Sequence, residues 1–373
     1  MNIVLIGPVY PYKGGIAHYT SLMYRALAKE NDVTMISYSM QYPKLLFKNE
    51  QRDYSNDMFK VEGTQFLINT ANPFNLIRVG KKIKKMNPDL VIMQWWHPYF
   101  APCYRILESA IGKSIKKMFI CHNVFPHERF PMDRFLTKMV MKHGDYYIVH
   151  SKSDGEDLLS IKKNAKYMQN PHPTYNAFKI RDIDKWQARQ ELNIHSQQKI
   201  LLFFGFVREY KGLKHLLRAM PEIREQIDDI RLMVVGAFGD DRQDYLDLIA
   251  EKGIKDCVEV IDGYTPDNEV EKYFAASDLV VCPYESATQS GIVQIAYGFD
   301  KPVVATNVGG LPDVVKDKKT GYLVEPQNPG ELAKVIIDFY SNRREEEFME
   351  HIKECAHEFS WEKMVETIML LAK

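Results

Sequence analysis

Short, continuously apolar segments alternate with helical patterns along the whole chain, and this alternation is the feature that most constrains the fold. Most of the segments are runs of consecutive apolar residues rather than alternating ones, so both faces of the sheets they form are expected to be covered. Helical patterns such as 18–30 and 210–227 separate them. The order predicts an α/β fold with parallel sheets between layers of helices. The ten candidate strands are 2–6, 33–37, 90–94, 118–122, 146–150, 200–205, 231–236, 258–261, 279–282 and 302–306.

The chain is long enough for two such domains, since it has 373 residues and a domain takes about 150. A stretch with two prolines and no periodicity, 169–182, separates two halves of similar layout. We place the boundary there, giving domains 1–172 and 173–358. Two Rossmann-like domains of this kind are expected to face a central cleft, with ligands at the carboxyl ends of the strands.

Composition excludes several classes of protein. Hydrophobic residues make up 45% and charged residues 26% of the chain, which is ordinary for a soluble globular protein. No apolar run approaches the ~20 residues that span a bilayer, and the first residues lack the basic segment of a signal peptide. The five cysteines are far apart and form no C-x-x-C pair, which indicates reduced thiols and a cytoplasmic protein.

Charge is unevenly distributed although the net charge is zero. Residues 1–172 carry 24 Lys and Arg against 14 Asp and Glu, and residues 173–373 carry 25 against 35. Basic clusters lie at 80–86, 112–118 and 129–143. They are either ordinary solvated surface or a basic half that meets an anionic membrane or substrate. In the third cluster Arg134, Lys138 and Lys142 recur every four residues, which fits an interfacial helix or, more commonly, a helix packed on its own core.

A small-residue loop with one acid is the most suggestive motif. Glu285 follows the strand candidate 279–282, and the residues 286–291 after it have no bulky side chain. A helical pattern begins at Ile292. Such a loop exposes backbone N–H groups at a helix N-terminus, which favours a phosphate.

Two cations stand in a second strand-to-helix loop. Arg208 and Lys211 follow the candidate strand 200–205 and precede Gly212 and a helix. Two fixed cations at the carboxyl end of a strand can neutralise a diphosphate. An isolated pair with this spacing is usually solvated surface, but its place at the expected edge of the sheet favours a binding role.

Two further positions lie where strands of the first half end. Gly14 and Gly15 directly precede a helical pattern, and paired glycines let a ligand approach the backbone closely; a tight turn without a ligand is an equal alternative. His122 follows the strand candidate 118–122, at the edge where ligands bind, or else it is a hydrogen-bonded structural histidine. The aromatic run 94–100 fits sugar stacking or the filling of a core edge.

Metal chemistry has little support in the sequence. No H-E-x-x-H or P-loop pattern occurs. The single D-x-D match, Asp182 to Asp184, precedes a helical pattern and is interpreted as helix N-terminal acids. We therefore expect no metal and no cofactor.

Taken together, these stretches resemble the retaining, GT-B-fold glycosyltransferases of the large family four, also called group 1. The resemblance covers nearly the whole chain. Besides the motifs above, it rests on the segments 150–158, 301–315 and 320–326. The ending 359–373 is similar to the last helix of the family, which packs back on the N-terminal domain.

The resemblance implies a role for each motif. The C-terminal domain would hold a nucleotide-sugar donor, a UDP- or GDP-sugar, and the N-terminal domain a glycan or lipid-linked acceptor. Arg208 and Lys211 would bind the diphosphate, Glu285 the hydroxyls of the sugar, and His122 would meet the sugar from the other domain. Contacts to the donor are also implied for Gly14, Gly15, Gln289, Ser290, Gly291 and Ile292.

The chain departs from the family at the second acid of the E-x7-E motif. Val293 stands eight residues after Glu285, and Gln294 follows. In relatives this second Glu commonly binds the ribose, so Gln294 is assigned that contact with one hydrogen bond in place of a carboxylate.

The sequence thus predicts a metal-independent, retaining hexosyltransferase of polysaccharide biosynthesis that acts on a glycan or lipid-linked acceptor. It is expected in the cytoplasm, either free or peripheral at the inner membrane surface, with no nucleic-acid partner. A nucleotide-sugar epimerase of the same fold is an alternative, although the further acids it needs are not identified. A non-catalytic nucleotide-sugar-binding module is a third reading, because of the missing Glu.

Overall fold

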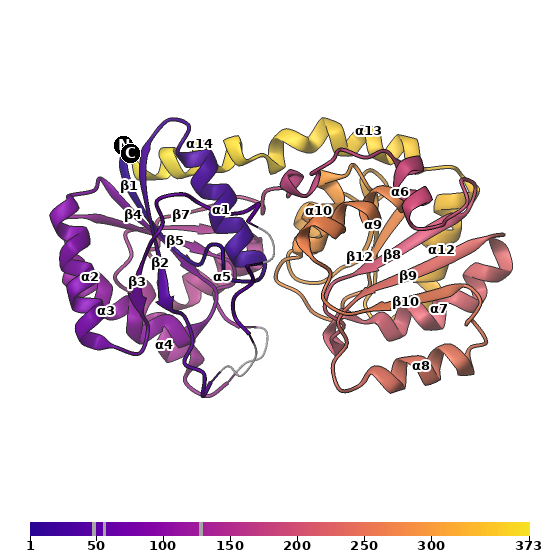
Figure 1. Ribbon diagram of the computed structural model, residues 1–373, viewed down its shortest axis with the longest axis horizontal. Helices are drawn as coiled ribbons and strands as arrows, with labels where there is room; N and C mark the ends of the chain where they lie inside the picture. Colours follow the sequence, from indigo (N-terminus) through magenta and orange to yellow (C-terminus); the bar gives the residue numbers. More distant parts are fainter. Residues whose placement is uncertain (47–49, 55–56, 127–129) are drawn as a thin grey trace. The chain divides into compact units, whose positions relative to one another are not determined.

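The computed structural model describes residues 1–46, 50–54, 57–126 and 130–373. The chain forms two compact units, each built on one parallel sheet (Figure 1). Unit 1 comprises Met1–Pro171 and Ser360–Lys373, and unit 2 comprises His172–Phe359. The sequence analysis placed the boundary after residue 172.

Unit 1 has seven parallel strands in the order β3-β2-β1-β4-β5-β6-β7. Successive strands are added on one side from β1 to β3 and on the other side from β4 to β7, so the switch point of this doubly wound sheet lies between β1 and β4. The strands are β1 Asn2–Ile6, β2 Asp32–Met40, β3 Gln65–Asn69, β4 Leu90–Trp95, β5 Lys116–Cys121, β6 Tyr146–Val149 and β7 Tyr167–Gln169.

Two helical layers cover this sheet. On one face α1 (Gly15–Leu27) and α14 (Trp361–Ala372) lie side by side (Figure 1) and bury Met23 and Ile368 against the strands. The other face is covered by helices whose apolar residues join a second core cluster. These helices are α2 Pro73–Met86, α3 Ala101–Ile111, α4 Asp133–Met141 and α5 Lys152–Ile161.

Unit 2 repeats the plan with six parallel strands in the order β10-β9-β8-β11-β12-β13. Its switch point lies between β8 and β11. The strands are β8 Lys199–Phe204, β9 Ile230–Gly236, β10 Val258–Asp262, β11 Leu279–Cys282, β12 Val303–Thr306 and β13 Gly321–Val324. Its helices are α6 Lys185–Glu191, α7 Leu213–Gln226, α8 Arg242–Glu251, α9 Val270–Ala276, α10 Gly291–Gly298, α11 Leu311–Val314, α12 Pro329–Ser341 and α13 Glu345–Cys355.

All ten predicted strands are present, within a few residues of their predicted ends. Three strands were missed: β3, β7 and β13. Each lies at an edge of its sheet. Most residues of β3 and β7 are not fully buried, so neither has the continuous apolar run of a strand that is covered on both faces. Strand β13 begins with a glycine, so its apolar run is only Tyr322–Val324, shorter than the usual strand signal.

Candidate functional site

The predicted phosphate-binding residues of unit 2 lie at the switch point of its sheet. The loop after β8 carries Arg208 and Lys211, and the loop after β11 carries Glu285 and leads into α10. Because β8 and β11 are adjacent parallel strands, both loops leave the same edge of the sheet. The structure joins them directly, since the amide of Glu285 donates to the carbonyl of Tyr210 over 2.7 Å.

The two cations of the first loop have no anionic partner among the described residues. Neither Arg208 nor Lys211 makes an ion pair or side-chain hydrogen bond there. A Cβ placed on Gly205 would lie 3.0 Å from Nζ of Lys211 and 3.4 Å from Cδ1 of Ile292 in α10. The ammonium therefore sits between the β8 turn and the start of α10.

The protein around Lys211 makes its charge costly. Burial, with a smaller contribution from the nearby Arg208, lowers the pKa of Lys211 to about 8. The side chain is nevertheless partly exposed. A cation that is partly desolvated and unpaired gains more from an arriving anion than a fully solvated one would.

Glycines allow the loops to approach closely. Gly212 has φ 67°, and a Cβ there would lie 1.9 Å from the carbonyl oxygen of Pro283. Gly309 has φ 52°, and a Cβ there would lie 1.5 Å from the carbonyl oxygen of Ala287. Both positions need glycine for conformation and for space. They fix the loop that carries Glu285 from two sides.

Helix α10 begins directly at this edge. Ser290 is its N-cap, with Oγ accepting from the amide of Val293. The first amides of a helix have no intrahelical acceptor and favour an anion. Nε2 of Gln289, just before the helix, is buried without a hydrogen-bond partner among the described residues.

Gln294 lies inside unit 2, not on its surface. Its side chain is 1% exposed, and neither amide atom has a partner among the described residues. Its backbone carbonyl accepts from Tyr175. A buried amide without partners is costly, and at 1% exposure the side chain is closed to a ligand in this structure. The assignment to the ribose remains a prediction.

Glu285 is held by donors from two other segments. Its Oε1 accepts from Nε2 of His215 at 2.8 Å and lies 3.1 Å from Nζ of Lys214, both in α7. Its Oε2 accepts from Nε2 of Gln327 at 3.0 Å. The carboxylate is thereby fixed in position, and Oε2, which accepts from Gln327 alone, keeps a lone pair for a ligand.

These contacts also keep the carboxylate charged. Burial alone would raise the pKa of Glu285, but the hydrogen bond from His215 and those from the other two donors outweigh it, and the pKa is lowered. The sequence analysis identified none of the three donors. His215 is one of the buried residues of α7, so its spacing gave no sign of a role at the site.

In unit 1, His122 follows β5 and lies in the interior. It is 5% exposed, and its ring packs edge-on against Tyr19 at 4.5 Å between centroids. Nε2 donates to Oε1 of Gln94 over 2.8 Å, and Gln94 lies on the neighbouring strand β4. The ring is thus held at the carboxyl edge of the sheet, and its contact with a sugar remains a prediction.

Gly14 and Gly15 stand at the N-terminus of α1. Gly14 has φ 101° and is the N-cap, without a side-chain hydrogen bond. A Cβ at either position would meet nothing within 4 Å. The pair therefore leaves open space at the carboxyl edge of unit 1, in contrast to the packed glycines of unit 2.

Aromatic residues fill the same edge of unit 1. Tyr42 follows β2 and Trp96 follows β4, and the indole Nε1 donates to the hydroxyl of Tyr42 over 3.2 Å. Tyr42, Trp96 and Tyr99 are only partly buried and pack on a core cluster. Partly exposed rings with polar tips can stack on sugars as well as fill a core edge. His127 and Glu128, which follow His122 in the sequence, lie outside the described residues.

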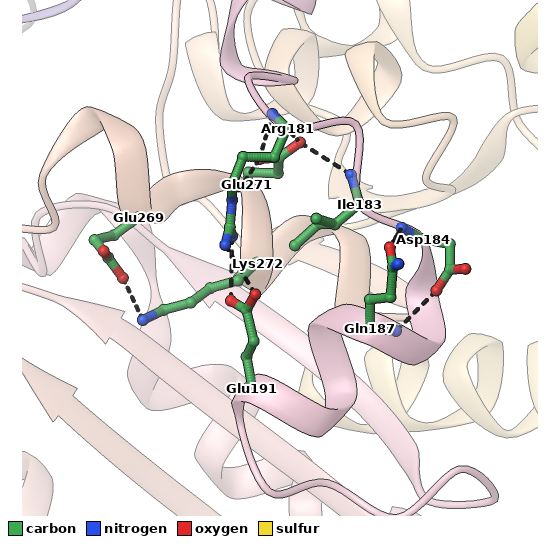
Figure 2. Close-up of polar contacts among 8 residues, drawn as sticks. All are labelled: Arg181, Ile183, Asp184, Gln187, Glu191, Glu269, Glu271 and Lys272. Atoms are coloured by element: carbon green, nitrogen blue, oxygen red, sulfur yellow. Dashed lines mark hydrogen bonds and ion pairs between the residues drawn. The ribbon is translucent and has the colours of Figure 1, made fainter.

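Asp184, the second acid of the D-x-D match, has a structural role (Figure 2). Asp184 is the N-cap of α6 and forms a reciprocal capping box with Gln187, which confirms its interpretation as a helix N-terminal acid. The fully buried Glu271 accepts from the amides of Arg181 and Ile183. Within the described ranges, no group of three or more His, Cys, Asp or Glu residues could hold a metal ion.

An open pocket of about 480 Å³ lies beside the site, between α7 and α8. Lys214 and Arg218 are its only cations, against five acids. This balance disfavours a phosphate. The acids are Glu209, Asp241, Asp244, Asp247 and Glu251.

Two α/β units, each built on one parallel sheet, are the architecture of the GT-B class of fold. Unit 2 also carries the cations Arg208 and Lys211 and a helix N-terminus at its switch point. Similarity to solved structures agrees. Sucrose-phosphate synthase from Thermosynechococcus elongatus matches with a TM-score of 0.73 and 19% identity, covering 99% of this chain and 97% of that one. Anabaena HepE in complex with UDP-glucose matches with a TM-score of 0.73 and 16% identity, covering 100% and 98%.

Sequence comparison gives the family. The family "Glycosyl transferases group 1" matches residues 184–359, and "Glycosyltransferase Family 4" matches residues 13–169. Spore coat protein SA of Bacillus subtilis (strain 168) is 26% identical over 99% of this chain and 98% of its own length. D-inositol 3-phosphate glycosyltransferase of Mycobacteroides abscessus is 27% identical over 62% of this chain and 52% of its own. The chain belongs to the group 1 glycosyltransferases and is a glycosyltransferase, which confirms the resemblance seen in the sequence.

Proposed function

We propose that the protein transfers a hexose from a nucleotide-sugar donor to a glycan or lipid-linked acceptor, with retention of the anomeric configuration. Unit 2 binds the donor and unit 1 the acceptor. The observation that carries the proposal is the unpaired pair Arg208 and Lys211 at the switch point of unit 2, beside the N-terminus of α10.

The chemistry follows from where charge develops. When the bond from the sugar to the phosphate breaks, negative charge builds on the leaving diphosphate. Fixed cations and helix amides that already point at this place stabilise the charge without reorganising. The same groups perform the task often given to a divalent cation, so we expect turnover to persist in EDTA.

A UDP-sugar is the donor class that we favour. HepE, which shares the fold, is described in complexes with UDP and with UDP-glucose. In this chain Gln294 would meet the ribose with an amide, and this contact requires the side chain, which is 1% exposed, to turn outward. An amide both donates and accepts, so it can serve ribose hydroxyls without the charge of a carboxylate.

Glu285 is the residue that we assign to the hydroxyls of the sugar. Its lowered pKa keeps it a hydrogen-bond acceptor near neutral pH. His122 would contact the sugar from unit 1. We propose that the acceptor attacks on the face from which the diphosphate leaves, and that a phosphate oxygen takes its proton.

We propose that the reaction takes place in the cytoplasm. The five cysteines are unpaired, which fits a reducing compartment. Among the described residues, no helix is both long enough and apolar enough to cross a bilayer.

The test is incubation with UDP-, GDP- and ADP-sugars, with and without EDTA, followed by detection of free nucleotide and of the sugar. Release of UDP with transfer or hydrolysis of the sugar supports the proposal. Release of UDP with an epimerised sugar favours the epimerase. Binding of a donor without turnover in the presence of candidate acceptors contradicts the catalytic assignment.

A further inference from the structure

The outer surface of the α2–α3–α4 layer of unit 1 has no exposed acid. These three helices contain only two acidic residues, Glu108 and Asp133, and both are buried. Their cations are Arg78, Lys81, Lys82, Lys84 and Lys85 in α2, Arg105 in α3, and Arg134 and Lys138 in α4. The exposed charges of these three helices are therefore all positive, whereas α5, at the end of the same layer, carries the exposed Glu156.

Helix α2 places large apolar side chains on the same surface. Phe74 is 82% exposed and Ile77 is 40% exposed. They share the outward stripe with Arg78, Lys81 and Lys85, because residues three and four apart lie on one side of a helix. Leu76 and Ile83 are buried on the opposite side. Among the described residues these three cations have no ion-pair or side-chain hydrogen-bond partner.

Helix α4 repeats the arrangement independently. Phe135 is 63% exposed in its first turn, and Met132, just before the helix, is 64% exposed. Lys138 and Lys142 follow Phe135 along the same stripe, opposite to the buried Thr137 and Val140. Like α2, α4 begins where a strand leaves the carboxyl edge of the sheet, so each helix offers an apolar first turn on the edge that carries the proposed acceptor site.

One expectation from the sequence needs correction at this point. Arg134 was grouped with Lys138 and Lys142 on a single free face. In the structure its Nη2 donates to the carbonyl and the hydroxyl of Ser160 in α5, each at 3.3 Å, and its guanidinium lies over Phe125. Arg134 therefore points toward α5, and only Lys138 and Lys142 belong to the outward stripe.

We infer that this surface, formed by α2 and α4, docks on an anionic lipid bilayer, with Phe74 and Phe135 entering the interface and the lysines meeting the headgroups. A membrane fits better than a nucleic acid because Phe74, Ile77, Met132 and Phe135 offer apolar side chains that a phosphate backbone does not use. Positive charge and exposed apolar side chains together are the features of an interfacial helix. The inference extends the proposed function by naming a lipid-linked acceptor as the substrate class.

The opposite face of unit 1 provides the contrast. Helix α14 carries Glu362 and Glu366, which pair with Lys29 and Lys363. Leu370 is 63% exposed there, so it is as accessible as Phe135 without the surrounding positive charge. It supplies a matched control for the apolar substitutions.

The test is co-sedimentation of the full chain with vesicles, without donor or acceptor, so that failure leaves the transferase assignment untouched. One set of vesicles is phosphatidylcholine alone, and the other contains one part phosphatidylglycerol to two parts phosphatidylcholine. We expect binding to the anionic set only, and release as salt rises from about 0.1 M to about 1 M, where the Debye length falls from about 10 Å to about 3 Å.

Two variants separate the contributions. The variant K81E/K85E/K138E/K142E is expected to lower affinity at least ~100-fold, since each cation near such a surface contributes several-fold. The variant F74S/F135S is expected to lower it about tenfold or more. The controls K319E/K334E in unit 2 and L370S on the opposite face should bind like the wild type.

Three results overturn the inference: wild-type protein that stays in solution with anionic vesicles, equal losses in the controls and in the surface variants, or unchanged binding in F74S/F135S. Single-stranded RNA that binds more tightly than the vesicles and does so equally in F74S/F135S would instead show a nucleic-acid surface.

Discussion

The two units have the same strand order around the switch point, yet the carboxyl edges of their sheets differ in chemistry. In unit 2 that edge holds free cations, a helix N-terminus and a carboxylate fixed by three donors. In unit 1 it holds open glycines, partly exposed aromatic rings and a histidine that bonds a neighbouring strand. The shared fold supplies an edge where loops converge, and the side chains decide which half of a reaction each edge can serve.

The largest effect is expected from removing the cations of unit 2. Arg208→Ala and Lys211→Ala should each raise the activation free energy of donor turnover by ~3–4 kcal/mol, as for other electrostatic donors to developing charge. The melting temperature should change little because neither side chain makes an ion pair or a side-chain hydrogen bond among the described residues, and Lys211 would lose only a 5.9 Å contact of its Nζ with the ring of Tyr284. Turnover of UDP-sugar by purified protein measures this, with Lys334→Ala as a control. Wild-type turnover in both variants would falsify the phosphate assignment.

The glycines give a second contrast between the units. Gly309→Ala should destabilise the protein by about 2–4 kcal/mol, because it combines a left-handed backbone with a clash against the carbonyl of Ala287. Gly15→Ala has space and no positive φ, so thermal unfolding should be unchanged.

Turnover then tests what Gly15 does. If the open glycines serve close approach of a ligand, Gly15→Ala lowers turnover while leaving stability intact. Full activity in Gly15→Ala would show that Gly14 and Gly15 form a turn without a ligand. Equal stability of Gly15→Ala and Gly309→Ala would contradict the packing argument.

A smaller effect is expected from the support of Glu285. His215→Gln removes a hydrogen bond that lowers the pKa of Glu285, so kcat should fall about tenfold. With that donor weakened, the pKa of Glu285 rises, and the acid limb of the pH–rate profile moves to higher pH. The exposed His195 supplies the control variant His195→Gln. A merely structural role for His215 would lower stability without moving the profile.

The smallest effect concerns unit 1 alone and does not touch the site. Burial raises the pKa of Glu108 to about 8. When the pKa of an acid is raised in the folded state, its contribution to stability is fully present below the pKa of the unfolded chain. That contribution is lost as the pH rises to the folded-state pKa, here about 8. Glu108→Gln should therefore raise the free energy of unfolding by about 1–2 kcal/mol above pH 8 and not at pH 5. Denaturant titrations at both pH values would show no such difference if the carboxyl ionises freely.

The interior strands could be predicted because a strand covered on both faces is largely apolar, as 90–93 and 279–282 are. Edge strands escape this rule, and β3 and β7 were missed for that reason. The order of Arg208, Lys211 and the small-residue loop located the site in the sequence. His215 could not be found, since it lies 70 residues from Glu285 in a helix whose buried face looks like ordinary core. Nor did the sequence show that Gln294 is enclosed.

The central claim is that the cationic edge of unit 2 holds the diphosphate of the donor, and Lys211 offers the most direct test. Because its pKa is about 8, the free protein loses this charge at a pH where an ordinary lysine keeps it. Calorimetric titration with UDP at about pH 7 and about pH 9 should show affinity falling roughly five- to tenfold in the wild type. In Lys211→Arg, which stays charged at both pH values, affinity should remain level. Equal pH dependence in the two proteins, or none in the wild type, would contradict the account.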